Sequence, residues 1–291
     1  MTKPKLLIQL DGDKQASVFD AVVGVDAEIG HLLQYHSVQA EQVRDLVHGA
    51  MFTRGPQDLH NTAVFIGGAN VAHGESLLQA AVSCFFGPMR VSVMLDANGA
   101  NTTAAAAVLA AARHVDLSRS EALVLAATGP VGQRAVRLLA RAGCKVRVAS
   151  RSADRAAATC EQVLASVAGA VLTPLATSNT EETSAALEGT NLVIAAGAAG
   201  IELLSAATRA ACSSLRVAID LNAVPPLGIG GVEVTDKAVE HDGVICYGAI
   251  GVGGTKMKVH KAAIKKLFSA NDLVLDAEEI YEIGRQLEAA S

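Results

Sequence analysis

The chain of 291 residues is long enough for two domains of ordinary size, and 51% of its residues are hydrophobic. Its net charge is -5 with both signs interspersed, which excludes the basic stripe typical of nucleic-acid-binding surfaces. No apolar run reaches the roughly 18 to 20 residues of a membrane-spanning helix, and the apolar stretch near the N-terminus is too short for a secretory leader, so we expect a cytoplasmic protein without nucleic-acid or membrane partners.

The first hundred residues alternate short apolar runs with segments whose apolar residues recur every three or four positions. Parallel strands need a helical crossover between them, so this alternation predicts a parallel sheet with helices. We expect strands over 5–10, 32–35, 62–66 and 91–95 and helices over 17–25, 40–51 and 71–85. A long helix over 101–115 follows, because Asn101 is a good capping residue and the segment is rich in alanine, and we expect it to bridge two domains.

The alternation restarts at Ala122 and gives the mononucleotide-binding pattern of strand, helix and strand. The expected elements are strands over 122–126, 145–150, 191–196 and 216–220 and helices over 131–141 and 153–167. Segments 220–231 and 248–254 are rich in turn-forming residues and are predicted as loops. Helices over 256–268 and 277–287 close the chain and are expected to fold back on the first domain, which gives a two-domain α/β fold.

A glycine-containing turn stands between the strand 122–126 and the helix 131–141. Gly129 and Gly132 match the second and third glycines of the dinucleotide-binding fingerprint, and Ala127 stands at the first. The second glycine lets the backbone approach a pyrophosphate, and the helix N-terminus supplies N–H groups for the anion. We therefore expect cofactor contacts from Thr128, Gly129, Pro130, Val131 and Gly132, and from the small residues Ala196 and Gly197 after a later strand.

The tip of the strand 145–150 indicates which dinucleotide binds. An NAD site places an acidic residue here to bind the ribose 2′-hydroxyl, whereas this strand ends in Ser150, Arg151 and Ser152, with Arg155 one turn later. Arg151 can pair with a 2′-phosphate and stack on adenine, so the sequence favours NADP. The alternative is that these are solvated polar residues, partly neutralised by Asp154.

Five cysteines are widely spaced along the chain and form no C-x-x-C pair. A structural metal site needs clustered ligands, so we expect free thiols in a reducing compartment and no metal. The residues concerned are Cys84, Cys144, Cys160, Cys212 and Cys246.

Seven segments spread over the chain carry a more specific signal than the glycine turn. They are SVFD at 17–20, FIGG at 65–68, FGP at 86–88, DANGANTT at 96–103, TGPVG at 128–132, NAVPPLGIGG at 222–231 and GVGGTK at 251–256. With them the whole chain resembles the bacterial NADP-dependent methylene-tetrahydromethanopterin dehydrogenases, one branch of which also acts on methylene-tetrahydrofolate. The resemblance implies a pterin domain from residues 1–100 and 258–291, a Rossmann-like NADP domain from 101–257, and a homo-oligomer, commonly a trimer. It also adds Asn222 to the cofactor contacts.

The activity that the resemblance implies is hydride transfer from the methylene bridge of the pterin to NADP, which leaves a methenyl cation. No proton has to be removed, so catalysis depends on holding the two reacting carbons close together rather than on a general base. Because positive charge grows on the pterin, a nearby carboxylate stabilises the transition state, and Asp20 and Asp96 are the candidate catalytic carboxylates. The alternatives are a helix surface charge for Asp20 and a turn cap for Asp96.

Lys256 follows three glycines in a segment expected to be a loop, and the match to the family makes it the first candidate for touching the substrate. A cation is unfavourable beside a forming cation, so we expect Lys256 to contact polar atoms of the pterin; the alternative is a solvated lysine. Phe19 either stacks on the pterin or fills the core, and Asn98 and Thr102 either bind a ligand or cap the long helix. His260 reads as a packed helix residue.

Two other functions stay open. A dehydrogenase of a small keto acid needs a proton donor for the alkoxide, and no Lys/Asp pair with that role is evident. A non-catalytic NADP sensor would leave the polar segment 96–103 and Lys256 without a purpose. Tetrahydromethanopterin and tetrahydrofolate both fit as the carrier, because they share the reacting ring.

Overall fold

The computed structural model describes residues 3–290, which fall into two units. Unit 1 holds residues 3–102 and 257–290, and unit 2 holds residues 103–256. The division falls inside two helices, α4 (Ala100–Ala112) and α9 (Ala249–Leu267). Residues 104–111 of α4 (AAAAVLAA) are apolar on every side of the helix and buried.

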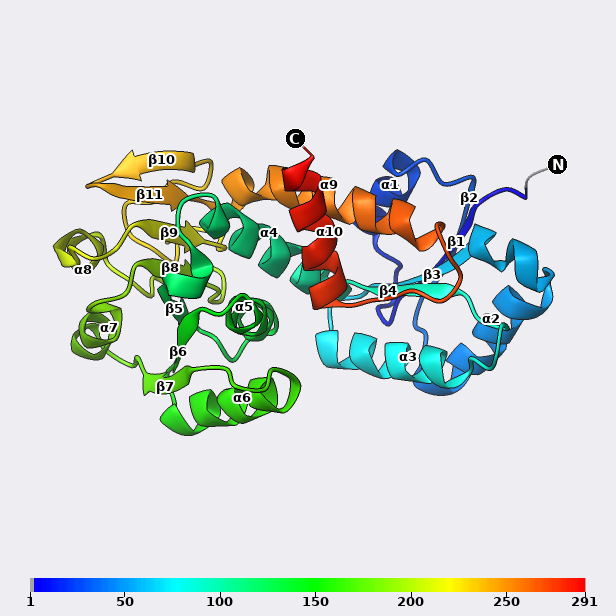
Figure 1. The fold of residues 1–291 in the computed structure, drawn as a ribbon, viewed down its shortest axis with the longest axis horizontal. Coiled ribbons are helices and arrows are strands. Elements are labelled where there is room, and N and C mark those ends of the chain that lie inside the picture. Colours follow the sequence, from blue (N-terminus) through cyan, green and yellow to red (C-terminus); the bar gives the residue numbers. More distant parts are fainter. Residues whose placement is uncertain (1–2, 291) are drawn as a thin grey trace. The chain divides into compact units, whose positions relative to one another are not determined.

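Unit 1 is built on a five-stranded parallel sheet in the order β12-β4-β3-β1-β2. The strands are β1 (Leu6–Leu10), β2 (His31–Tyr35), β3 (Thr62–Ile66), β4 (Ser92–Leu95) and β12 (Val274–Leu275). Helices α2 (Ala40–Phe52) and α3 (Val71–Ser83) lie on one face and α1 (Val18–Asp26) on the other, as right-handed crossovers require (Figure 1). The short helices η1 (Pro56–Asn61) and η2 (Ala97–Gly99) and the last helix α10 (Ala277–Ala289) complete the unit.

Unit 2 is a seven-stranded sheet in the order β10-β11-β9-β8-β5-β6-β7, parallel except for β10. The strands are β5 (Glu121–Leu125), β6 (Lys145–Ser150), β7 (Leu172–Ala176), β8 (Leu192–Ala195), β9 (Val217–Asp220), β10 (Lys237–His241) and β11 (Val244–Tyr247). Helices α5 (Pro130–Arg141) and α6 (Ala153–Ser166) cover one face, and α7 (Thr180–Leu187) and α8 (Ala206–Ala211) cover the other (Figure 1). A short helix η3 (Leu117–Arg119) leads into β5. The strand order reverses between β5 and β8, which is where doubly wound sheets bind ligands.

The segment 248–254 is a helix and not the expected loop, since α9 begins at Ala249. Its glycines serve close packing rather than a turn. A Cβ atom at Gly251 would overlap the carbonyl oxygen of Asp236, and one at Gly248 would overlap that of Glu233. Lys256 accordingly lies inside a regular helix.

Among the described residues, no helix combines the length and apolarity that a membrane span requires. All the strands expected from the sequence are present, with ends that differ by at most one residue. The structure adds β7, β10, β11 and β12 and the helices α7 and α8.

Candidate functional site

The turn between β5 and α5 brings helix and strand into backbone contact. Gly129 is the N-cap of α5 and Pro130 its first residue, a position where proline is well tolerated. A Cβ atom at Gly132 would lie 2.7 Å from Cα of Ala127 and 2.8 Å from the carbonyl oxygen of Ala126, so only glycine fits without a shift of the backbone. Ala127 is fully buried and lacks the positive φ that would demand glycine; that φ belongs to Ala126, at 54°. Alanine at the first fingerprint position is therefore compatible with the turn.

Small residues from two adjacent strands meet at the switch point. Ala196 follows β8, and its N–H donates to the carbonyl oxygen of Leu125 at 3.1 Å. A Cβ atom at Gly129 would lie 3.8 Å from the carbonyl oxygen of Ala196, so the Thr128–Gly132 turn and the Ala196–Gly197 turn are neighbours. Together they place the backbone of glycine and alanine residues beside the N-terminus of α5, which is the feature that close approach of a pyrophosphate needs.

Asn222 follows β9, the next strand of the same edge, and its side chain is engaged within its own loop. The amide donates to the carbonyl oxygen of Pro226 at 3.1 Å and accepts from the N–H of Val224 at 2.9 Å. Asp220 is fully buried and accepts from the N–H groups of Asn222 and Ile229. Burial raises the pKa of Asp220, and those N–H groups oppose the increase. This pair shapes the loop, and Asp220 was not among the site residues expected from the sequence.

The tip of β6 carries positive charge and hydroxyl groups. Ser150 is buried at the end of the strand, whereas Arg151 and Arg155 are exposed. Ser152 caps α6 by accepting from the N–H of Arg155, and its own N–H donates to Oγ of Ser150, both at 3.4 Å. Asp154 is the acidic residue of the first turn of α6, so the strand end itself presents no carboxylate.

A second group of polar residues lies at the carboxyl edge of the sheet in unit 1. Asp11 follows β1, Gly67 and Gly68 follow β3, and Asp96 follows β4, in three neighbouring strands. Asp11 is fully buried and accepts from the N–H groups of Asp13 and Ser17, each at 2.9 Å, which fixes the loop before α1. Ser17 then caps α1 by accepting from the N–H of Asp20 at 3.2 Å.

Asp20 leans from the first turn of α1 over the end of β3. A Cβ atom at Gly67 would lie 3.1 Å from Oδ2 of Asp20, so the carboxylate rests against a backbone that carries no side chain. Burial raises the pKa of Asp20 to about 6; the charge of His260 and a hydrogen bond from Ser17 lower it, and Asp96 and Asp11 raise it further. Asp20 is therefore a carboxylate that changes charge just below neutral pH.

Asp96 lies beneath this surface. Its side chain is fully buried and accepts from the N–H of Thr102 at 3.0 Å and from the hydroxyl of Thr102 at 2.7 Å. Thr102 is thus a buried partner of Asp96 at the start of α4. Asn98 is exposed, has a φ of 54°, and donates its N–H to the carbonyl oxygen of Gly68.

His260 of α9 joins the same cluster. It is 1% exposed, and its Nδ1 lies 3.8 Å from Oδ2 of Asp96. Its ring stacks on Phe65 at 5.6 Å and 22°, and the ring of Phe19 lies 6.4 Å away at 38°. Phe19 itself is 52% exposed, so part of its side chain is accessible to solvent. Lys256 is partly buried and, four residues before His260, lies on the same side of α9.

The structure brings Phe19, Asp20, Asp96 and Asn98, all named from the sequence, into one neighbourhood. It adds Asp11 and His260, which the sequence analysis did not name as site residues. A signal for each was present. Asp11 directly follows a buried strand, at the edge where parallel sheets bind ligands, and His260 is one helical turn after Lys256.

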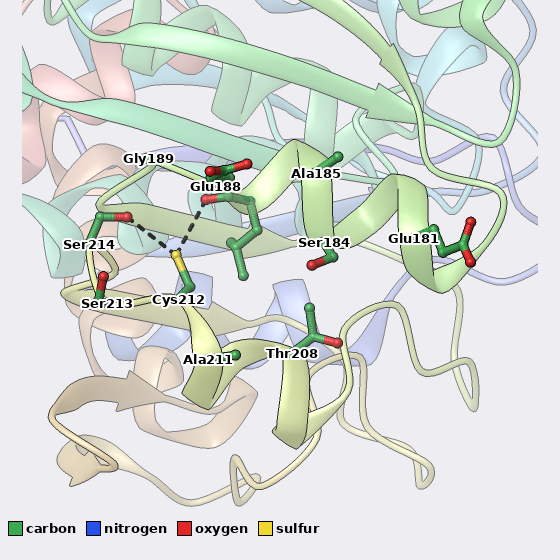
Figure 2. Close-up of a pocket in the computed structure, with 11 residues that line it drawn as sticks. Glu181, Ser184, Ala185, Glu188, Gly189, Thr208, Ala211, Cys212, Ser213 and Ser214 are labelled. Carbon is green, nitrogen blue, oxygen red and sulfur yellow. Dashed lines mark hydrogen bonds between the residues drawn. The ribbon is translucent and has the colours of Figure 1, made fainter.

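Two hollows of unit 2 are lined by other residues. One, of about 610 Å³, is lined by Ser184, Glu188, Thr208 and Cys212 among others (Figure 2). The thiol of Cys212 is hydrogen-bonded to the hydroxyl of Ser214 and to the carbonyl oxygen of Leu187. This hollow opens where β8 and β9 begin, so it is at the opposite edge of the sheet from the glycine turn. A second, of about 430 Å³, is lined in part by Glu121 and Arg147. Within residues 3–290, His, Cys, Asp and Glu side chains form no group of three suited to a metal ion.

This chain is similar to one protein family and to two proteins of known name. A family model described as methylene-tetrahydromethanopterin dehydrogenase, N-terminal, matches residues 18–98. The bifunctional protein MdtA of Methylorubrum extorquens is 43% identical over 285 residues, which make up 97% of this chain and 99% of that protein. An NAD(P)-dependent methylenetetrahydromethanopterin dehydrogenase from the same organism is 29% identical over 287 residues, covering 94% of this chain and 95% of that protein.

Among solved structures, the fold is similar to that of shikimate 5-dehydrogenase from Listeria monocytogenes in complex with shikimate and NAD. The TM-score is 0.60 at 13% sequence identity, and the match covers 98% of this chain and 96% of that one. Identity this low supports a shared two-domain α/β architecture and nothing about the substrate.

Proposed function

Because this chain belongs to the methylene-tetrahydromethanopterin dehydrogenase family, we infer that it is an oxidoreductase that transfers a hydride from the methylene bridge of methylene-tetrahydromethanopterin to a nicotinamide dinucleotide. The observation that carries this inference is the acidic cluster of unit 1, which consists of Asp11, Asp20 and Asp96. Asp20, Asp96 and the adjacent Phe19 fall in the segment that the family model matches. The reaction places positive charge on the pterin, and carboxylates held beside it stabilise that charge.

We assign the pterin site to unit 1, in line with the pterin domain of residues 1–100 and 258–291 that the family resemblance implies. The exposed ring of Phe19 offers a stacking face, and Asn98 offers an exposed amide in the turn after β4. Asp20 is the carboxylate nearest the surface and acts directly on the developing cation. Asp96 is fully buried, so its charge acts through the protein, and Thr102 holds it in place.

Lys256 takes the remaining contact with the substrate. We assign its ammonium group to a carbonyl or another polar atom of the pterin, because a second cation next to the reacting carbon would oppose the reaction. Its place in a regular helix supports this role, since sites on helices are more rigid than sites on loops.

We assign the dinucleotide to unit 2, as expected from residues 101–257. The turn at the start of α5 fits the dinucleotide, because Gly129 adds no side chain at the helix N-terminus and Gly132 allows the close crossing of α5 and β5. The dinucleotide supplies, when bound, the ring carbon that accepts the hydride. The N–H groups at the start of α5 hold the pyrophosphate, with contacts from Thr128, Gly129, Pro130, Val131 and Gly132. Ala196, Gly197 and the loop that Asn222 shapes flank the opposite side of the switch point.

We propose that NADP is preferred over NAD. Arg151 and Arg155 are exposed beside the tip of β6, with Ser150 and Ser152 supplying hydroxyl groups. A 2′-phosphate forms charge-assisted hydrogen bonds with such groups, whereas the ribose of NAD finds no carboxylate at the strand end.

The test is an assay of the purified protein with NADP or NAD as the nucleotide. The substrates are methylene-tetrahydromethanopterin, methylene-tetrahydrofolate and shikimate, and the measured quantity is the rate of nucleotide reduction. We expect turnover with a methylene pterin and NADP, and none with shikimate. The ratio of kcat/KM values identifies the preferred carrier. Absence of turnover with both pterins would overturn the proposed function.

We further propose a homo-oligomer, with a trimer favoured by the family resemblance, and a cytoplasmic location. Exposed apolar side chains on α1 and on the edge strand β2 support assembly: Val18, Val22, Val25 and Leu33 are 75%, 54%, 63% and 43% exposed. Five free cysteines support a reducing compartment. Light scattering coupled to size-exclusion chromatography measures the mass of the assembly, and a monomer would contradict the proposal.

A further inference from the structure

His260 occupies the centre of the acidic cluster, although hydride transfer needs neither an acid nor a base from it. Its imidazole is 1% exposed. The imidazole stacks on the ring of Phe65, and the ring of Phe19 lies 6.4 Å from it at a tilt. A residue that merely filled this space would be an aliphatic or aromatic side chain, because a buried imidazole carries the cost of desolvating two polar nitrogens. The choice of histidine therefore indicates an electrostatic use.

The charged and hydrogen-bonding groups that act on Asp20 come from four parts of unit 1. Asp11 follows β1, Asp96 follows β4, Ser17 caps α1, and His260 comes from α9, which also carries Lys256 on the same side. Three carboxylates repel one another in a site with little solvent, which disfavours a negative charge on Asp20. The charge of His260, whose Nδ1 lies 3.8 Å from Oδ2 of Asp96, acts in the opposite sense.

The ring contacts of His260 extend its influence to the stacking surface. Phe65 is fully buried in β3 and holds one face of the imidazole, while Phe19 meets it at a tilt of 38°. Phe19 and Asp20 are consecutive residues of α1. A single side chain of α9 thus contacts both the ring and the charge environment that α1 presents.

We propose that His260 is a positioning residue of the pterin site, which offsets the mutual repulsion of Asp20, Asp96 and Asp11 and braces the ring of Phe19. The proposal rests on the proposed function and deepens it. The cationic product gains from a carboxylate at Asp20, and the imidazole allows that carboxylate to stay ionised beside Asp96 and Asp11. The interaction lowers the pKa of Asp20 from the value that burial and its acidic neighbours would otherwise set.

Two variants separate charge from shape. His260→Phe keeps a ring against Phe65 and Phe19 but removes the charge, and His260→Gln removes both the ring and the charge. We expect the acid limb of the kcat/KM profile to move to higher pH by about 1 unit in either variant, which is about a threefold loss at pH 6.5. In His260→Gln we also expect a several-fold higher KM for the pterin. His48→Gln is the matched control, because His48 packs on Phe52 in α2 outside the cluster.

A measurement without substrate separates this proposal from the proposed function. Carbon-13 NMR of labelled aspartate carboxyl groups, assigned with Asp20→Asn, should show Asp20 titrating near pH 6 in the parent protein and higher in His260→Phe. An unchanged midpoint in both variants, with a lower melting temperature alone, would mean that His260 is structural and would overturn the proposal. A parent protein that shows the shift but turns over no pterin would overturn the proposed function instead.

Discussion

At the scale of single residues, the ionised carboxylate of Asp20 lowers the stability of the folded state. Its native pKa of about 6 lies above the ordinary value of 3.8, so the folded state binds the proton more tightly than the unfolded state does. The ionised carboxylate therefore destabilises the fold above about pH 6, and this effect disappears as the pH falls below about 4. The active form is the strained one, as expected for a functional carboxylate.

Asp20→Asn should therefore be more stable than the parent protein at pH 8, by about 1 to 2 kcal/mol after allowing for partial exposure. Its kcat should fall by about 100-fold, because the developing cation loses its nearest carboxylate. Urea unfolding at pH 8 and at pH 4 measures the first effect, which should vanish at the lower pH. Asp45→Asn, on the exposed side of α2, is the control and should change neither quantity. Parent-like turnover in Asp20→Asn would remove Asp20 from the mechanism.

Arg151 decides the choice of dinucleotide at the same scale. Arg151→Ala removes an exposed guanidinium at the tip of β6, so the KM for NADP should rise by about 10- to 100-fold with little change in kcat. The KM for NAD should stay nearly constant. Arg119→Ala, which lies in η3 before β5 at the other edge of the sheet, should leave both constants unchanged. An unaltered KM for NADP in Arg151→Ala would refute the assignment.

At the scale of elements, periodicity predicted those strands and helices that bury one clear face. The strands β1, β2, β3, β4, β5, β6, β8 and β9 and the helix α4 were all expected, because apolar runs and alanine-rich stretches are typical of strands and helices. Of the missed strands, β7 contains Pro174 and is half-exposed, β10 is an edge strand, and β12 has two residues; β11 is mostly buried but has only four residues.

The prediction of a loop over 248–254 was wrong for a physical reason. Its glycines predict a loop by propensity, but three-dimensional packing needs them where α9 crosses the backbone of Glu233 and Asp236. The same limit applies to the cluster around Asp20. Sequence order predicts which residues follow which strands, whereas the contact between His260 and Asp96 joins positions 164 residues apart and needs the fold.

The β5–α5 unit gives a prediction for a whole element. In Gly132→Ala the new methyl group would lie 2.7 Å from the backbone of Ala127, so α5 must move away from β5. We expect a loss of about 1 to 3 kcal/mol in the free energy of unfolding and a clear rise in the KM for NADP. Gly49→Ala in α2 meets open space and should stabilise the protein slightly, as alanine does in helices. Equal behaviour of the two variants would contradict the close crossing.

At the scale of the whole molecule, binding of a cofactor to unit 2 is linked to the stability of the chain. A ligand that binds only the folded state at 100 times its Kd adds about 2.7 kcal/mol to the free energy of unfolding. We therefore expect NADP to raise the melting temperature more than NAD at the same concentration, because only NADP engages the charged tip of β6. Hydrogen exchange should slow mainly at the Thr128–Gly132 turn and at residues 150–155. The two dinucleotides should become equivalent in Arg151→Ala, since that variant lacks the group that distinguishes them. Equal stabilisation of the parent protein by NAD and NADP would show that the β6 tip does not select the cofactor, even if both are reduced in the assay.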